Sequence, residues 1–462
     1  MNGSAAPTSA RRVLVLASAA SFLVYLDVTV VNVAFPAIES SFAGASRETL
    51  AWVLAAYNVT FAALLVPGGR IGDRVGRKRL FLLGLAVFAL ASAGCAAASS
   101  AGVLIGFRVL QAIGGALLVP ASQGLVLEAF PLERRTTAMS LWVAAGAVAA
   151  ALGPPLGGLL VESGSWRWVF LINLPIAAAV GAAGVRALRE SREPGTGFPD
   201  PIGIALSGLA VGSLVLAIVQ GEAWGWGSAA TLAAFGGFAV FAPLFLFRTR
   251  RAAVPALDLS LFGSRPFSLA NAASVLVGVA FYGQIFAAVL FLTAVWDYSP
   301  LEAGFALAPA PLAAAIAAAV VGRRVQGAAL VRAVAVGLVL FAGGTLWLRL
   351  ALEVTPNYAG VMLPATALIG VGAGLAVSLL AAAAAAVIPS ASFAAGGAVN
   401  SATRQIGAAL GVAIVVAVVG TPAPRDALAA FGGGWIAIGA AALAALPIVL
   451  ALGELDGRVP RK

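Results

Sequence analysis

The sequence contains no histidine, only two lysines and a single cysteine, and each scarcity removes a class of function. Without histidine there is neither an H-E-x-x-H zinc motif nor a histidine proton relay. Neither Lys78 nor Lys462 stands in a Walker A sequence, and no G-x-S-x-G elbow occurs. Cys95 has no second cysteine with which to form an internal disulfide. We therefore expect no enzyme, no ATP-driven pump, no metal site and no cofactor.

Charged residues are also scarce. They make up 10% of the chain, whereas 61% of the residues are hydrophobic and the mean hydropathy is +1.02. A membrane-spanning helix needs about 20 mostly apolar residues, and fourteen stretches meet this requirement. We therefore expect an all-α membrane protein. The expected helices cover residues 13–35, 48–68, 79–99, 102–128, 136–161, 166–187, 202–222, 229–247, 268–293, 301–321, 332–352, 359–388, 395–420 and 427–452.

The net charge of +10 could suggest a nucleic-acid partner, but the basic residues gather in alternate loops. Of the 28 Lys and Arg residues, we assign 23 to one side of the membrane, Arg404 among them, and four to the other, while Arg108 lies inside a helix. Cytoplasmic loops carry the excess of Lys and Arg. We therefore expect a multi-pass protein of the plasma or inner membrane, with both termini in the cytoplasm and no nucleic-acid partner.

Asp27 is the one carboxylate deep within an apolar stretch. At 1.5 Å per residue, Asp27 and Arg108 both lie about 21 Å above the inner face of a core about 30 Å thick. Ionisable groups at that depth are costly and mark proton, ion or substrate sites. We expect this pair to couple proton movement to transport, with the proton as coupling ion. A static ion pair that ties two helices together is the alternative.

A second charged motif, G-R-I-G-D-R-V-G-R-K-R, runs from Gly69 to Arg79. Its glycines allow backbones to approach closely, and Asp73 can sit at a helix N-terminus and pair with arginines of neighbouring helices. We interpret the motif as a conformational latch; an ordinary positively charged cytoplasmic loop is the alternative. The expected latch residues are Gly69, Gly72, Asp73, Arg74, Gly76, Arg77 and Lys78.

This motif resembles the signature loop between helices 2 and 3 of the major facilitator superfamily. Further segments are similar to the fourteen-helix drug:proton antiporter branch of that superfamily, although Ala112 and Ala149 replace glycines of its motifs. These segments are L-D-V-T-V-V-N-V-A-F-P (Leu26–Pro36), R-V-L-Q-A-I-G-G-A (Arg108–Ala116), G-P-P-L-G-G (Gly153–Gly158), W-R-W-V-F-L-I-N-L-P (Trp166–Pro175) and N-S-A-T-R-Q-I-G-A-A-L-G (Asn400–Gly411).

The resemblance implies two six-helix repeats with two extra helices between them. The expected domains are an N-terminal bundle over residues 1–187, linkers with the two extra helices over 188–265, and a C-terminal bundle over 266–462. It also implies an antiporter motif in the fifth helix, where glycines allow tight packing and prolines interrupt hydrogen bonding. Generic small-residue packing is the alternative for this motif, whose residues are Gly153, Pro154, Gly157 and Gly158.

Uncharged polar residues inside the apolar stretches are candidates for a substrate cavity. Interhelical hydrogen bonding is the alternative role for each of them. They are Tyr25, Asn32, Asn58, Gln111 and Gln123 in the first half, and Tyr282, Gln284, Asn400 and Gln405 in the second.

Together these features predict a proton-coupled antiporter that exports amphipathic, lipophilic small molecules, cationic or neutral, by alternating access. We leave open the substrate's identity and the oligomeric state, for which a monomer is the simplest form. One alternative is a dedicated exporter of a self-made metabolite or antibiotic on the same scaffold. A non-transporting membrane sensor or scaffold is a third.

Overall fold

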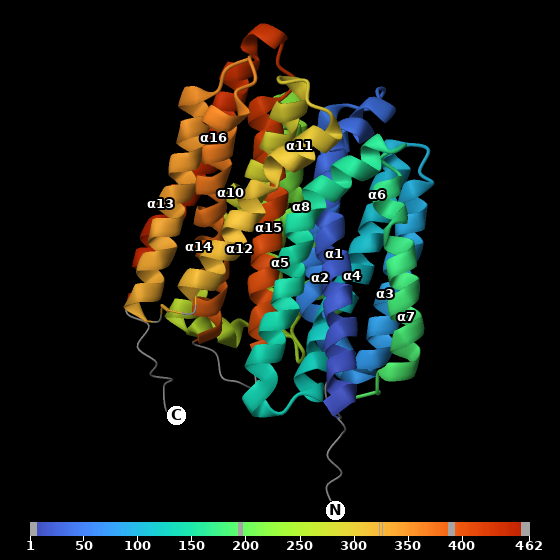
Figure 1. Cartoon of the computed structure of the whole chain (residues 1–462). Helices are drawn as coiled ribbons and strands as arrows, with labels where there is room; N and C mark the ends of the chain where they lie inside the picture. Colours follow the sequence, from blue (N-terminus) through green and yellow to red (C-terminus); the bar gives the residue numbers. More distant parts are fainter. Residues whose placement is uncertain (1–6, 193–196, 323, 326, 387–392, 454–462) are drawn as a thin grey trace, which may run out of the picture.

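The computed structural model describes residues 7–192, 197–322, 324–325, 327–386 and 393–453. Met1 and Lys462, the two ends expected in the cytoplasm, lie outside these ranges. Within them the regular elements are helical, with no strand. Figure 1 shows long helices running side by side between two ends of a bundle. We call the end at which the first helix begins the inner end and the opposite end the outer end.

The helices divide into three sets along the chain. The first comprises α1 (Pro7–Ser41), α2 (Arg47–Val75), α3 (Arg77–Ala96), α4 (Ala101–Ala129), α5 (Leu132–Glu162), α6 (Trp168–Leu171) and α7 (Asn173–Ala187). The second comprises α8 (Pro201–Trp224), α9 (Ala229–Arg251) and the short η1 (Leu259–Gly263). The third comprises α10 (Arg265–Ala294), α11 (Pro300–Leu307), α12 (Pro309–Gly322), α13 (Ala328–Ala351), η2 (Tyr358–Met362), α14 (Leu363–Ala386), α15 (Phe393–Val419), η4 (Pro424–Asp426) and α16 (Ala427–Leu450).

Among the described residues, 13 helical segments are long and apolar enough to cross a membrane, and the bent α5 brings the number to 14. The fourteen expected spans therefore have counterparts in the fold. The α5 segments Ala144–Ala150 and Leu152–Glu162 meet at 41°. Pro154 and Pro155 explain this bend, because a proline ring clashes with the carbonyl four residues earlier in a helix.

The two six-helix sets pack in the same pattern, as expected for a repeat. Helix α1 packs on α5, α2 on α4 and α3 on α4; the corresponding pairs of the second set are α10 with α15, α12 with α14, and α13 with α14. Glycines permit matching close approaches. A Cβ added to Gly84 of α3 would lie 2.8 Å from the carbonyl oxygen of Gly114, and one added to Gly337 of α13 would lie 2.8 Å from that of Gly372.

The two extra helices, α8 and α9, pack on each other, and α8 also contacts α2 and α15. Asp200 caps α8 by accepting a hydrogen bond from the backbone N–H of Gly203 at 3.0 Å. The same carboxylate binds Arg248 of α9 in a bidentate pair, at 2.8 and 3.0 Å. This hydrogen-bonded guanidinium lowers the pKa of Asp200 below its usual value of 3.8. Asp200 thus fastens the inner ends of α8 and α9 together.

The Gly69–Arg79 motif is not a loop in the structure. Helix α2 continues to Val75 and α3 begins at Arg77, so Gly76 alone forms the connection. Its φ of +119° is one that residues with a side chain rarely adopt. The prediction of a loop between these helices is therefore wrong, because one glycine suffices to reverse the direction of the chain.

Candidate functional site

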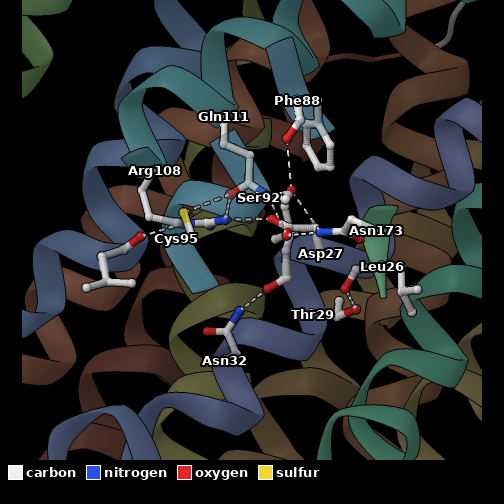
Figure 2. Close-up of polar contacts among 12 residues, drawn as sticks. Leu26, Asp27, Thr29, Asn32, Phe88, Ser92, Cys95, Arg108, Gln111 and Asn173 are labelled. Carbon is white, nitrogen blue, oxygen red and sulfur yellow. Dashed lines mark hydrogen bonds and ion pairs between the residues drawn. The ribbon is translucent and has the colours of Figure 1, made fainter. Parts of the chain in front are cut away.

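Asp27 and Arg108 form a buried ion pair inside the first half of the protein (Figure 2). Arg108 Nη1 donates to Asp27 Oδ2 at 2.6 Å, and both residues are 1% exposed. The other carboxylate oxygen, Oδ1, accepts hydrogen bonds from Gln111 Nε2 at 2.8 Å and from Asn173 Nδ2 at 2.9 Å. Asp27 is therefore held by three donors, which satisfy both of its oxygens.

Hydrogen bonds to Ser92 hold two of these donors, Gln111 and Asn173, in place. Ser92 Oγ accepts from Gln111 at 2.7 Å and from Asn173 at 3.2 Å, and it donates to the carbonyl of Phe88 at 2.9 Å. These partners come from α1 for Asp27, α3 for Ser92, α4 for Arg108 and Gln111, and α7 for Asn173. Four helices must therefore keep their relative positions for the network to persist.

Arg108 has further partners of its own. Its Nε donates to the carbonyl oxygen of Val53 in α2 at 3.0 Å, and its Nη1 donates to Gln111 Oε1 at 2.6 Å. The guanidinium also lies over the Tyr57 ring, 4.1 Å from the ring centre. Tyr57 has a buried hydroxyl oxygen without a hydrogen-bond partner in the part of the chain that the structure describes. Arg108 can thus shift among several acceptors if Asp27 becomes neutral.

The expected ion pair between Asp27 and Arg108 is present in the structure. Gln111, expected as a cavity residue, donates a hydrogen bond to the same carboxylate. Ser92 and Asn173 were not among the residues expected at this site. Asn173 stood within the Trp166–Pro175 motif, and its position in an apolar stretch was the available signal. Nothing in the local sequence indicated that a residue 146 positions away would contact Asp27.

The latch residues lie together at the inner end of α2 and α3. Arg77 Nη2 donates to Asp73 Oδ1 at 2.8 Å, and Arg77 Nη1 lies 3.7 Å from Glu128 Oε2 of α4. Asp73 does pair with an arginine, but it occupies the last turn of α2 and not a helix N-terminus. Gly72 accepts a hydrogen bond from the backbone of Gly76 at 2.9 Å.

Glu190, from the segment after α7, is the acid at the N-terminus of α3. Its carboxylate accepts hydrogen bonds from the backbone N–H groups of Lys78 at 3.1 Å and Arg79 at 3.3 Å. Lys78 Nζ donates to the Val185 carbonyl at 2.7 Å. Arg74 lies over the ring of Phe198, 3.9 Å from its centre. Glu190 and Phe198, which lie in the expected linker region 188–265, thus contact residues of the predicted latch.

The antiporter-motif glycines of α5 lie at two helix contacts. A Cβ on Gly157 would lie 3.1 Å from the Val30 carbonyl oxygen of α1, and Gly153 faces Thr29 of the same helix. Gly158 faces the backbone of Pro300 at the start of α11. Apart from this motif, Gly69 of the predicted latch lies by Pro120 of α4. Gly304 of α11 in turn faces the carbonyl of Pro154. The motif therefore joins the two halves near the outer end.

The candidate cavity residues have different surroundings. Asn32 bonds within α1, to the Val28 carbonyl at 2.6 Å. Asn400 Nδ2 donates to Ser274 Oγ at 2.8 Å. Tyr25 and Gln123 are half-buried, and Tyr282 is 7% exposed. Three others have a buried oxygen with no hydrogen-bond partner among the described residues: Asn58, Gln284 and Gln405.

Comparison with known proteins identifies the family to which this architecture belongs. The family model for the Major Facilitator Superfamily matches residues 17–412. The multidrug resistance protein Stp of Mycobacterium tuberculosis is 32% identical over 399 residues, which cover 86% of this chain and 74% of Stp. The methylenomycin A resistance protein of Streptomyces coelicolor is 32% identical over 424 residues, covering 90% and 87%. A protein of the same name from Bacillus subtilis is 39% identical over 299 residues, covering 64% of each chain.

Solved structures show the same fold. A peptide transporter POT determined in complex with sulfate superimposes with a TM-score of 0.68 at 19% identity, covering 98% of this chain and 95% of the transporter. The family match, the repeated helix packing and the membrane-spanning helices agree with one another, and they identify a transport protein rather than an enzyme. The chain is a multi-pass membrane protein that belongs to the Major Facilitator Superfamily.

Proposed function

We propose that the protein is a proton-coupled antiporter that exports amphipathic, lipophilic small molecules across the plasma membrane. The observation that carries this proposal is the buried Asp27–Arg108 pair. A carboxylate deep in a membrane protein is suited to load and release a proton. The names of the relatives support the export function: they include multidrug resistance and antibiotic resistance proteins.

Coupling follows from the hydrogen bonds around Asp27. While charged, the carboxylate holds α1 to α4 and α7 through Arg108, Gln111 and Asn173. Proton binding removes the charge that attracts Arg108, and the guanidinium can then rest on Val53 and Gln111 alone. The helices of the first half thereby acquire two arrangements, one for each protonation state of Asp27.

Alternating access requires the two halves to separate at one end at a time. At the outer end α5 and α11 pack backbone to backbone, and the rings of Phe35 and Phe286 meet at 4.9 Å. Arg47 also donates to the carbonyl of Gly420 across the halves. We assign the structure to a state closed at the outer end, which we place on the outside of the cell. A membrane potential of 100 mV supplies about 2.3 kcal/mol per proton moved inward.

Substrate charge follows from the same contacts. The sequence led us to expect cationic or neutral substrates. Because Asp27 already has three donors, we favour neutral amphiphiles over cations as substrates. A dedicated exporter of one self-made antibiotic is the second candidate, since one relative is named a tetracenomycin C resistance and export protein. A transport panel separates broad from dedicated export.

The experiment is proton-coupled transport by the purified protein in liposomes. Asp27→Asn should abolish substrate-dependent proton release while largely preserving substrate binding, because the amide has a similar shape but cannot carry a proton. Glu162→Gln, which changes an exposed carboxylate at the end of α5, is the matched control and should behave as the wild type. Undiminished proton release by Asp27→Asn would refute the proposed role of Asp27.

A further inference from the structure

A groove lies between the inner ends of α1 and α7, two helices that pack on each other and reach the lower end of the bundle in Figure 1. It is lined by Arg11, Arg12, Val15 and Leu16 of α1 and by Ala183 and Ala187 of α7. Its volume is about 280 Å³, which equals that of roughly nine water molecules. Because alanine carries only a methyl group, the α7 side leaves this space unfilled.

The groove opens toward the lipid rather than toward the interior of the bundle. The membrane-spanning part of α1 runs from Ala10 to Ser41, so Arg11 and Arg12 stand at its inner edge. Val15 lies within that span and is nevertheless 66% exposed, and Ala183 of α7 is exposed as well. Apolar side chains exposed within a membrane span meet lipid chains. The groove is therefore apolar along the membrane and cationic at its inner edge.

The two cations of the groove have no counterion from the protein in the part of the chain that the structure describes. None of the ion pairs there involves Arg11 or Arg12, and both side chains are exposed. Glu190, the acid that follows α7, already caps α3 and lies 3.6 Å from Arg79 Nε. The guanidinium groups of the groove are thus free to bind an anion from outside the protein.

The neighbouring end of α7 is basic too. Lys78 Nζ donates to the carbonyl of Val185, which lies between the two alanines of the groove in the sequence. Arg186 and Arg189 follow, and both are exposed. Positive charge concentrated at one place attracts anions and repels ammonium groups. Anionic lipids are enriched in the cytoplasmic leaflet, which the basic residues predict at this inner end.

We propose that the groove binds an anionic phospholipid of the cytoplasmic leaflet. The phosphodiester lies on Arg11 and Arg12, and an acyl chain follows Val15, Leu16 and Ala183. Guanidinium groups bind phosphate oxygens through paired N–H donors, and basic pockets between membrane helices on the cytoplasmic side bind anionic headgroups. This inference does not depend on the proposed export function.

The charges also select the headgroup. Phosphatidylethanolamine would bring its own ammonium group to a groove that already holds two guanidinium groups, and like charges repel. Phosphatidylglycerol carries the phosphodiester as its single charge, and its glycerol end is neutral. The groove therefore prefers phosphatidylglycerol over phosphatidylethanolamine with the same chains.

Lipid binding is measured with the purified full-length protein in phosphatidylcholine nanodiscs. A bimane fluorophore is attached to Ala179→Cys in a Cys95→Ala background. Ala179 is exposed and lies one turn before Ala183 on the same face of α7, about 12 Å deeper than Ala187. Lipids with brominated chains quench the fluorophore when they lie beside it. Brominated phosphatidylglycerol should quench with an apparent affinity about tenfold above that of brominated phosphatidylethanolamine.

Matched pairs of substitutions test whether the groove is responsible. Arg11→Gln combined with Arg12→Gln should bring the two lipids within about twofold of each other. Arg250→Gln combined with Arg251→Gln removes two exposed arginines at the inner end of α9, and this control should keep the preference. Lysine at positions 11 and 12 retains the charges without the planar forks, so it should keep part of the preference. If the first double variant does not fold, its two single variants decide the matter.

A soluble competitor distinguishes a lipid from a free phosphate ester. Glycerophosphoglycerol, the headgroup of phosphatidylglycerol without its chains, should leave the quenching by the brominated lipid unchanged at millimolar concentration. Displacement of the lipid by this compound would assign the groove to soluble phosphate esters and overturn the proposal. Equal quenching by the two brominated lipids would also overturn it. So would an equal loss of preference in the groove pair and the α9 pair, because general surface charge would then select the lipid.

Discussion

Arg108 Nη1 lies 2.6 Å from Asp27 Oδ2, and neither residue is more than 1% exposed. Each charge is compensated only while the other stays in place. Removing one partner of such a pair leaves an unpaired buried charge, whereas removing both leaves none. The pair therefore stabilises the protein weakly as a unit but resists any change that affects one member alone.

This asymmetry predicts the outcome of a double-variant cycle. Arg108→Met should lower the free energy of unfolding by about 3–5 kcal/mol, because Asp27 is left unpaired. Combining it with Asp27→Leu should recover much of that loss, yet transport should remain absent. Chemical denaturation in detergent micelles gives the stabilities, and liposome assays give the transport. Additive losses of stability in the double variant would contradict the model of a compensated pair.

Glu190 should matter for the rate of transport rather than for substrate affinity. Its carboxylate accepts hydrogen bonds from two backbone N–H groups at the start of α3, and losing such a cap costs about 1 kcal/mol. Glu190→Ala and the latch variant Asp73→Asn should each lower the maximal rate several-fold at an unchanged half-saturating concentration. Glu222→Gln, at the end of α8, is the control. A loss of affinity at an unchanged maximal rate would contradict a gating role.

The contact between α5 and α11 should decide whether the outer end can close. A Cβ on Gly158 would clash with the backbone of Pro300, so Gly158→Val should hold the two helices apart. Cysteine introduced at Phe35 in a Cys95→Ala background should then react faster with an impermeant maleimide added from outside. Gly106→Val, at a position with no atom within 4 Å of an added Cβ, is the matched control. Equal labelling of both variants would exclude this contact from the seal.

Asp200 should make a pH-dependent contribution to stability. Arg248 lowers the pKa of the Asp200 carboxyl below 3.8 in the folded protein. A carboxyl with a lowered pKa stabilises the fold fully above its unfolded-state pKa, and this contribution is lost as pH falls through the folded-state value. The difference in Tm between the wild type and Asp200→Asn should therefore be constant near neutral pH and shrink as the pH drops below about 3.9. A difference that grows in acid would contradict the pairing.

The orientation in the membrane can be tested by reporter fusions. The basic residues predict that Met1, Lys462 and the latch all face the cytoplasm. A periplasm-active phosphatase fused after Lys462 should be inactive, and one inserted between Gly225 and Ser228, in the connection from α8 to α9, should be active. The opposite pattern would reverse the assignment of the inner and outer ends.

Much of the site was visible in the sequence because burial of charge in an apolar stretch is rare. Asp27 and Arg108 stood out by depth alone, and their pairing followed from equal distances to the membrane face. The residues of the predicted latch lie together at the inner ends of α2 and α3, but their geometry differs from the expected one. Gly76 makes a connection of one residue where a loop was expected, and Glu190 replaces Asp73 as the acid at the start of α3.

By itself the sequence determined the number of membrane spans, the repeat and the position of the buried charges, because hydropathy and charge depend on local composition. Only the tertiary structure decided which donors surround Asp27. Asn173 and Ser92 come from separate helices whose rotation is set by packing against neighbours, such as the contact of Gly84 with Gly114. The sequence also placed Arg404 inside the expected helix 395–420, and in the structure it stands 11 positions after the start of α15, so it does not belong with the cytoplasmic residues among which it was counted.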